Sequence, residues 1–73
     1  MTTYRFTVVV EQDEDGVFIA SCPALAGCHS QGTSTEEALA HLKDAMRLHV
    51  EARRQLGEPI PVEVATDQIE VGV

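Results

Sequence analysis

Residues 22–42 read CPALAGCHSQGTSTEEALAHL and contain the signals for the end of one strand, a further strand and the start of a helix. Pro23 lacks a backbone donor, so a strand that precedes it must end there. Ser34 and Glu37 have the spacing of a capping box, in which the serine hydroxyl accepts from the third amide of a helix and the carboxylate reaches back. The stretch therefore predicts a strand end, a reversal at Gly27, a short third strand over 28–32 and a helix that starts at about Thr35.

The predicted helix carries one apolar face. Apolar side chains recur at steps of three and four residues, as they do on a helix that packs on a core. Acidic residues occupy its first turn and basic residues its last, and both complement the helix dipole. Gly57 suits the position after the last turn, and Pro59 prevents continuation. The apolar face comprises Ala38, Leu39, Leu42, Ala45, Met46, His49, Ala52, Arg53 and Leu56.

The sequence before residue 22 predicts a β-hairpin. Residues 4–10 place Tyr4, Phe6, Val8 and Val10 at alternate positions, which is typical of a strand with one face in a core. The polar run 12–16 ends in glycine and favours a turn. Residues 17–21 form the returning strand, and because it is apolar on both faces it is expected inside the sheet.

The C-terminal part predicts a fourth strand. Ile69, Val71 and Val73 alternate with polar or small residues within 61–73, and a short extended piece at 62–64 can precede them. The expected fold is one domain over residues 1–73, of the α/β (α+β) class with the order β-β-β-α-β. Its small, mainly antiparallel sheet is covered on one face by one helix.

The uncovered face of this sheet is predicted to mediate self-association. It carries Val9 and either Phe18 with Ala20 or Val17 with Ile19. An apolar face left open is a candidate contact between subunits. A chain of 73 residues also has a marginal core by itself, which favours a homo-dimer or homo-tetramer.

The net charge of −7, from twelve acids and five bases, argues against nucleic acid as the direct partner. Phosphate binding needs clustered Lys and Arg. An acidic domain suits a basic protein partner, although acidity also serves solubility alone. The helix carries four acids and four bases, so the acidic surplus lies in residues 11–15 and in the segment from Glu58 onward. No apolar run reaches membrane-span length and no signal peptide is seen, so a cytoplasmic location is expected, with cysteines reduced.

The cysteines and histidines do not match a catalytic or metal site. Cys22 and Cys28 are separated by more than the short spacer of a zinc knuckle, and no second pair follows. His41 and His49 stand two helical turns apart, too far to share one ion. His29 follows Cys28 directly, so on a strand the two side chains point to opposite faces. The cysteines are expected as small apolar fillers, and no catalytic residue, metal or cofactor is predicted.

Several motifs together resemble the HicB family of antitoxins. They are Asp13-Glu14-Asp15-Gly16, Val17-Phe18-Ile19-Ala20, the proline-leucine-glycine loop of 22–28, and Gln31-Gly32 followed by Thr33-Ser34-Thr35-Glu36-Glu37-Ala38-Leu39. Residues 57–61, which follow the predicted helix, resemble that family too. The resemblance implies a partial RNase H-like fold and a partner of the HicA type, a small basic ribonuclease that cleaves messenger RNA.

The resemblance thus predicts an antitoxin that neutralises its toxin by protein contact, without enzymatic activity of its own. An orphan homo-oligomeric binding domain without a toxin is the alternative. Many such antitoxins carry a further C-terminal DNA-binding module, and residues 61–73 leave no room for one, so no direct DNA binding is expected. The acids chosen for charge and exposure as toxin contacts are Asp13, Glu14, Asp15, Glu63 and Glu70.

Overall fold

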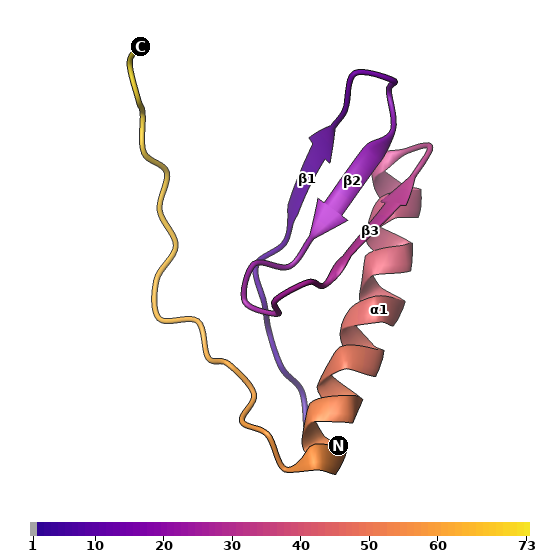
Figure 1. Cartoon of the computed structure of the whole chain (residues 1–73), viewed down its shortest axis with the longest axis vertical. Coiled ribbons are helices and arrows are strands. Elements are labelled where there is room, and N and C mark those ends of the chain that lie inside the picture. The colour runs from indigo at the N-terminus through magenta and orange to yellow at the C-terminus, as the bar shows by residue number, and fades with distance from the viewer. Residues whose placement is uncertain (1) are drawn as a thin grey trace.

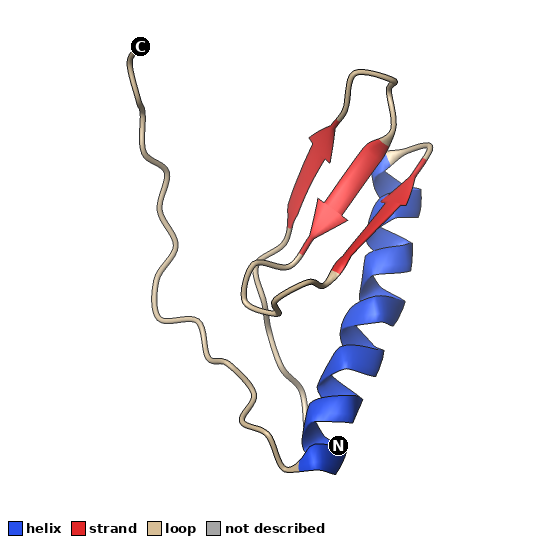
Figure 2. Cartoon of the chain, viewed as in Figure 1, coloured by secondary structure: helices blue, strands red, loops and turns tan. Residues whose placement is uncertain are grey.

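The computed structural model describes residues 2–73 and contains a three-stranded sheet and one long helix (Figure 1). β1 (Val9–Gln12), β2 (Phe18–Ser21) and β3 (His29–Gly32) are antiparallel neighbours in the order β1-β2-β3. Helix α1 (Thr35–Leu56) lies along one face of this sheet, as Figure 2 shows. The predicted α+β class, with antiparallel strands covered on one face by one helix, is confirmed.

The register of the central strand β2 decides which side chains meet the helix. Ala20 stands opposite Val10 of β1 and Ser30 of β3. Ala20 is fully buried, and Phe18 packs against the same core. Since side chains alternate along a strand, Val17 and Ile19 belong to the open face, with Val9. The sequence alone did not decide which of the two pairs faces the helix, because both faces of β2 are apolar.

The core draws on β2, the helix and the loop that connects β2 to β3. Its buried members are Ala20, Cys22, Leu25, Cys28, Ala38 and Leu42. The loop folds on itself: the Cys22 N–H donates to the Cys28 carbonyl at 3.0 Å, and the Cys28 N–H donates to the Leu25 carbonyl at 2.9 Å. These bonds pair the backbone groups of the loop while the Leu25 side chain is buried. The loop therefore covers one end of the core.

Both ends of α1 are those that the sequence predicts. The Ser34 hydroxyl accepts from the Glu37 N–H at 3.1 Å, and the Glu37 carboxylate accepts from the Thr33 N–H at 3.0 Å. The Glu37 carboxylate therefore binds the amide of Thr33, the residue before the N-cap Ser34. Gly57 ends the helix with a φ of 71°, in the left-handed region that favours glycine.

The first strand is shorter than predicted. The chain is extended from Tyr4 to Val8, but strand pairing begins only at Val9. Val9 lies opposite Ser21, the last residue of β2, and beyond Ser21 the chain turns into the loop toward β3. Residues 4–8 therefore have no opposing backbone on that side. Phe6 and Val8 nevertheless pack against the core, so the predicted face is correct.

The predicted fourth strand is wrong for this structure. Residues 61–73, including the piece at 62–64, form no strand, and Ile69 and Val71 are 85% and 78% exposed. The segment leaves the end of α1 and runs beside the N-terminal segment, away from the helix (Figure 1). Alternation shows that a segment suits a sheet, but a strand exists only where a neighbouring backbone supplies hydrogen bonds.

Candidate protein-binding surface

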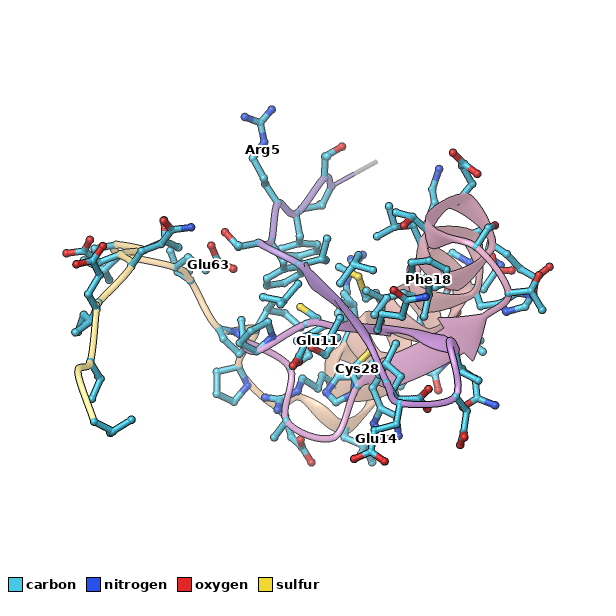
Figure 3. All side chains as sticks on the ribbon, turned by 90° about the horizontal axis from the view of Figure 1, so that it is seen from above. Arg5, Glu11, Glu14, Phe18, Cys28 and Glu63 are labelled. Atoms are coloured by element: carbon cyan, nitrogen blue, oxygen red, sulfur yellow. The ribbon has the colours of Figure 1, made fainter. Side chains whose placement is uncertain are left out.

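The hairpin between β1 and β2 presents acidic side chains at the end of the sheet. The Asp13 carboxylate accepts from the Asp15 N–H and the Val17 N–H, both at 2.9 Å, and Gly16 follows with a φ of 85°. Asp13 therefore organises the turn. Glu14 and Asp15 are exposed, and Figure 3 shows Glu14 pointing outward from the molecule. Of the three acids predicted here as contacts, two remain available to a partner.

Glu11 extends this acidic surface onto the open face, and the list of predicted contacts lacks it. It is exposed in β1 opposite Ile19 (Figure 3). The sequence could have indicated this, because Glu11 follows Val9 by two residues and therefore lies on the same face of the strand. Val9 is 40% exposed, and Val17 and Ile19 are half-buried, with His29 and Gln31 on the same face. The open face is therefore a short apolar strip between polar side chains.

Glu63 has a structural partner. Its carboxylate accepts from the Thr7 N–H and from the Thr7 hydroxyl, the latter at 2.7 Å. These two hydrogen bonds stabilise the ionised form and hold the pKa of Glu63 below its ordinary value. The Arg53 guanidinium donates to the Pro59 carbonyl at 3.0 Å nearby. Glu63 therefore tethers the C-terminal segment rather than joining the hairpin acids.

Glu70 lies farther along that segment and is exposed. The five predicted contact residues thus occupy two separate places, the hairpin and the C-terminal segment, which Figure 1 shows apart. Only Glu14 and Asp15 are neighbours that project freely. A partner that touches both places must be broad, or must use the hairpin alone.

An apolar groove lies between the N-terminal segment and α1. Alternate residues Tyr4, Phe6 and Val8 form one wall, and Leu39, Met46 and Val50 contribute to the other. Its volume is about 640 Å³. The polar lining residues are Thr2, Lys43, Arg47, Glu51 and Arg54, so bases outnumber acids three to one. The helix residues that face it come from the predicted apolar stripe and its flank.

The cysteines are buried, free thiols, in agreement with their predicted role as fillers. Burial raises the pKa of the Cys28 thiol, and the neighbouring Cys22 raises that pKa further. A thiol of raised pKa is a poor nucleophile, because the thiolate is the reactive form.

Each histidine makes a local contact. The ring of His41 donates from Nδ1 to the Gln31 carbonyl at 2.8 Å, and His29 donates likewise to the Gly27 carbonyl at 3.1 Å. His49 Nε2 accepts from Arg53 Nε at 2.9 Å. Within residues 2–73, no three His, Cys, Asp or Glu side chains converge as metal ligands do, and α1 is not apolar enough to cross a membrane.

The geometry defines a small acidic α+β domain with a negative hairpin and an apolar, base-rimmed groove. Residues 6–71 match the family model described as HicB_like antitoxin of bacterial toxin-antitoxin system. The chain therefore belongs to the HicB-like antitoxin family.

Similar proteins support this assignment. The chain is 40% identical to a UPF0150 protein of Thermoplasma acidophilum, over 78% of this chain and 83% of that protein. It is 42% identical to a UPF0150 protein of Synechocystis, over 82% and 76%. The crystal structure of the N-terminal domain of Burkholderia pseudomallei antitoxin HicB superposes with a TM-score of 0.71 and 30% identity, covering 84% of this chain and 72% of that one.

Proposed function

We propose that this protein is a non-catalytic antitoxin that binds a small, basic, mRNA-cleaving toxin of the HicA type and neutralises it. Membership of the HicB-like antitoxin family supports a toxin as partner. The acidic hairpin is the single structural observation that carries the proposal. A toxin that grips RNA must present a basic face, and an exposed acidic surface is its electrostatic complement.

The distribution of charge favours the hairpin as the centre of contact. α1 contains four acids and four bases, so its net charge is zero. The surplus is therefore divided between residues 11–15 and the segment after Gly57, with Arg5 as the remaining base. On the hairpin, Glu11 in β1 and Glu14 and Asp15 in the turn are exposed, and the Asp13 carboxylate holds that turn through two hydrogen bonds. Preorganised acids lose little conformational entropy on binding, which favours them over the acids of the C-terminal segment.

Neutralisation in this proposal is competition for the RNA-binding face. The hairpin acids pair with basic side chains of the toxin that would otherwise bind RNA phosphates. RNA and the antitoxin therefore cannot bind the toxin at the same time. No step of this mechanism needs a nucleophile or a metal, and the buried thiols and hydrogen-bonded histidines are consistent with that role. The protein acts where messenger RNA is cleaved, in the cytoplasm, and residues 1–73 contribute no operator contact.

Charge reversal at the hairpin tests the proposal. The double variant Glu14→Lys/Asp15→Lys is compared with Asp44→Lys, an exposed helix position whose partner is Arg47 at 3.6 Å. Asp13 is left unchanged because its carboxylate holds the turn. The candidate toxin is a HicA-type protein, purified as a variant without ribonuclease activity.

We expect the hairpin variant to bind this toxin at least about tenfold more weakly, with a shallower dependence on salt, because exposed charge pairs contribute on the order of 1 kcal/mol each. The control should bind normally. Titration calorimetry at two salt concentrations measures both effects. Equal affinity of the hairpin variant and the unsubstituted protein would refute the electrostatic account.

A further inference from the structure

The loop between β2 and β3 brings the two cysteines of this chain together. Ser21 and His29 are the last pair in the register of these strands, so Cys22 and Cys28 are the next pair in line. The Cys22 N–H donates to the Cys28 carbonyl at 3.0 Å, which continues the ladder one step beyond the strands. The cysteines are therefore cross-strand neighbours at the end of the sheet where the loop reverses the chain (Figure 1).

Both thiols lie on the face of the sheet that meets the helix. Side chains alternate along a strand, so Cys22 shares the face of Ala20, which is buried in the core. Cys22 and Cys28 are 2% and 7% exposed and belong to that same core. Burial raises the pKa of the Cys28 thiol, and the nearby Cys22 raises that pKa further. The two side chains therefore meet in one part of the core.

The backbone separation of this pair is suitable for a disulfide. Opposite residues at a hydrogen-bonded position of an antiparallel ladder have Cα atoms about 5.5 Å apart, and most disulfides join Cα atoms about 5.5–6 Å apart. The Cβ atoms of opposite residues lie roughly 4.5–5.5 Å apart, whereas a disulfide needs about 3.5–4.5 Å. Closing the bond therefore requires the two side chains to approach by about 1 Å.

The loop is open to a small oxidant on its outer side. Pro23, Ala26 and Gly27 are exposed, and the backbone between the cysteines is held by only two turn hydrogen bonds, one to the Cys22 carbonyl and one to the Leu25 carbonyl. Among residues 2–73 no polar or charged side chain is buried in the core, so no buried base activates either thiol. A small uncharged oxidant, of which hydrogen peroxide is the simplest, is therefore the class that reaches this pair.

We propose that Cys22 and Cys28 form a modification site, at which peroxide closes the pair reversibly into an internal disulfide. The sulfur of Cys28, the more exposed thiol, attacks one peroxide oxygen and breaks the O–O bond, which gives a sulfenic acid and one water. The Cys22 sulfur then attacks the Cys28 sulfur, and the sulfenic hydroxyl leaves with the Cys22 proton as a second water. The pair loses two electrons and two protons, and one peroxide becomes two waters.

The disulfide closes the loop 22–28 and restricts the unfolded chain, which stabilises the folded state. We expect the oxidised protein to unfold at a temperature roughly 5–15 °C higher than the reduced one. Disulfides inside cells are usually transient and redox-sensing, so a pair that thiols reduce again fits such a setting. The inference is independent of toxin binding, because the acidic hairpin lies at the other end of β2.

Mass spectrometry of the folded full chain after peroxide treatment tests the proposal. The monomeric chain should lose two hydrogen atoms, and neither thiol should then react with iodoacetamide in denaturant. Dithiothreitol should reverse both changes and return the unfolding temperature to that of the untreated protein. This readout needs no substitution, so it does not depend on the folding of any variant.

Two matched variants, each checked for folding by circular dichroism, separate the two steps. In Cys22→Ala no second thiol is present, so the Cys28 sulfenic acid should persist and be trapped by dimedone. Cys28→Ala keeps only the more buried thiol and should form the dimedone adduct at least about tenfold more slowly. Equal rates in the two folded variants would refute the assignment of Cys28 as the first thiol to react.

Three results for the unsubstituted protein would overturn the proposal. One is a folded chain that keeps both thiols under conditions that oxidise the same chain in urea, which would make the pair unreachable. Another is a gain of oxygen atoms at Cys28 without the loss of two hydrogen atoms, which would place Cys22 out of reach of the sulfenic acid. The third is an oxidised chain that unfolds at a lower temperature than the reduced one. None of these results depends on the affinity of the hairpin variants for a toxin, so the two proposals fail separately.

Discussion

Helix α1 and the segment after Gly57 have equally regular apolar patterns but opposite fates. In α1, Ala38 and Leu42 are 0% and 1% exposed because they pack in the core with Ala20 of β2 and with the loop that connects β2 to β3. In the segment 61–73, Val64 and Ile69 are 96% and 85% exposed. Periodicity thus favours a local conformation, whereas burial also requires an opposing surface at the right place.

The helix also has a local advantage that the segment lacks. A helix satisfies its own backbone, and α1 is capped at both ends by Ser34 and Gly57. An extended segment has no internal hydrogen bonds and needs a sheet edge. The first half of the segment finds a side-chain substitute, because the Glu63 carboxylate binds Thr7. After Glu63, none of the hydrogen bonds of residues 2–73 joins the segment to the rest of the chain, and the bond from the Gln68 N–H to the Asp67 carboxylate lies within the segment.

The largest expected effect comes from removing a buried side chain of helix α1. Leu42→Ala should lower the free energy of unfolding by about 2–5 kcal/mol, because it removes apolar contacts and leaves a cavity. A domain of this size has roughly 3–5 kcal/mol in total, so the variant should be largely unfolded at 25 °C. Val64→Ala should change stability by less than about 0.5 kcal/mol. Urea unfolding followed by circular dichroism measures both, and a similar cost at the two sites would contradict the burial described here.

A smaller effect is expected where the helix meets the sheet. A Cβ atom at Gly32 would lie 2.6 Å from the Ala38 backbone nitrogen, whereas nothing lies within 4 Å of a Cβ at Gly72. Gly32→Ala should therefore cost about 1–3 kcal/mol by forcing the first helical turn away from β3. Gly72→Ala should be neutral. Thermal unfolding of the two variants side by side would disprove the tight contact if their midpoints coincided.

The smallest effect concerns the tether at Glu63. Its pKa is lowered in the folded chain by the hydrogen bonds from Thr7. A lowered pKa means that the tether contributes above the ordinary pKa of glutamate and is lost as pH falls through the lowered value. The chemical shift of the Thr7 amide proton, followed by NMR, should change as the pH passes through the lowered pKa of Glu63. Thr7→Ala removes the hydroxyl donor and should move the Glu63 titration upward, and an unchanged titration would count against the tether.

Much of the sheet and helix, residues 9–56, was predictable because the signals for them are local. The capping pair Ser34 and Glu37, the terminator Gly57 and the turn at Gly16 each act within a few residues of themselves. The hairpin acids Glu14 and Asp15 were predictable as exposed for the same reason, since Asp and Gly favour turns. The second role of Asp13, as acceptor for two amides of its own turn, needed coordinates.

The rest depends on contacts between residues distant in the chain. Thr7 and Glu63 are 56 positions apart, and no local pattern relates them. The choice between Phe18 with Ala20 and Val17 with Ile19 depended on which face the helix reached, because β2 is apolar on both. The groove exists only because residues 2–8 extend beyond the end of β2 and pass beside α1.

By itself, the sequence determined the order of the three strands and the helix, the turn of the hairpin and both ends of the helix, because caps, turns and periodicity are properties of neighbouring residues. It also determined where the negative charge lies. Only the tertiary structure decided that 61–73 forms no fourth strand, that Glu63 is a tether and that a base-rimmed groove flanks α1. Those outcomes depend on which surfaces meet in space, and a pattern along one segment does not contain the position of its partner.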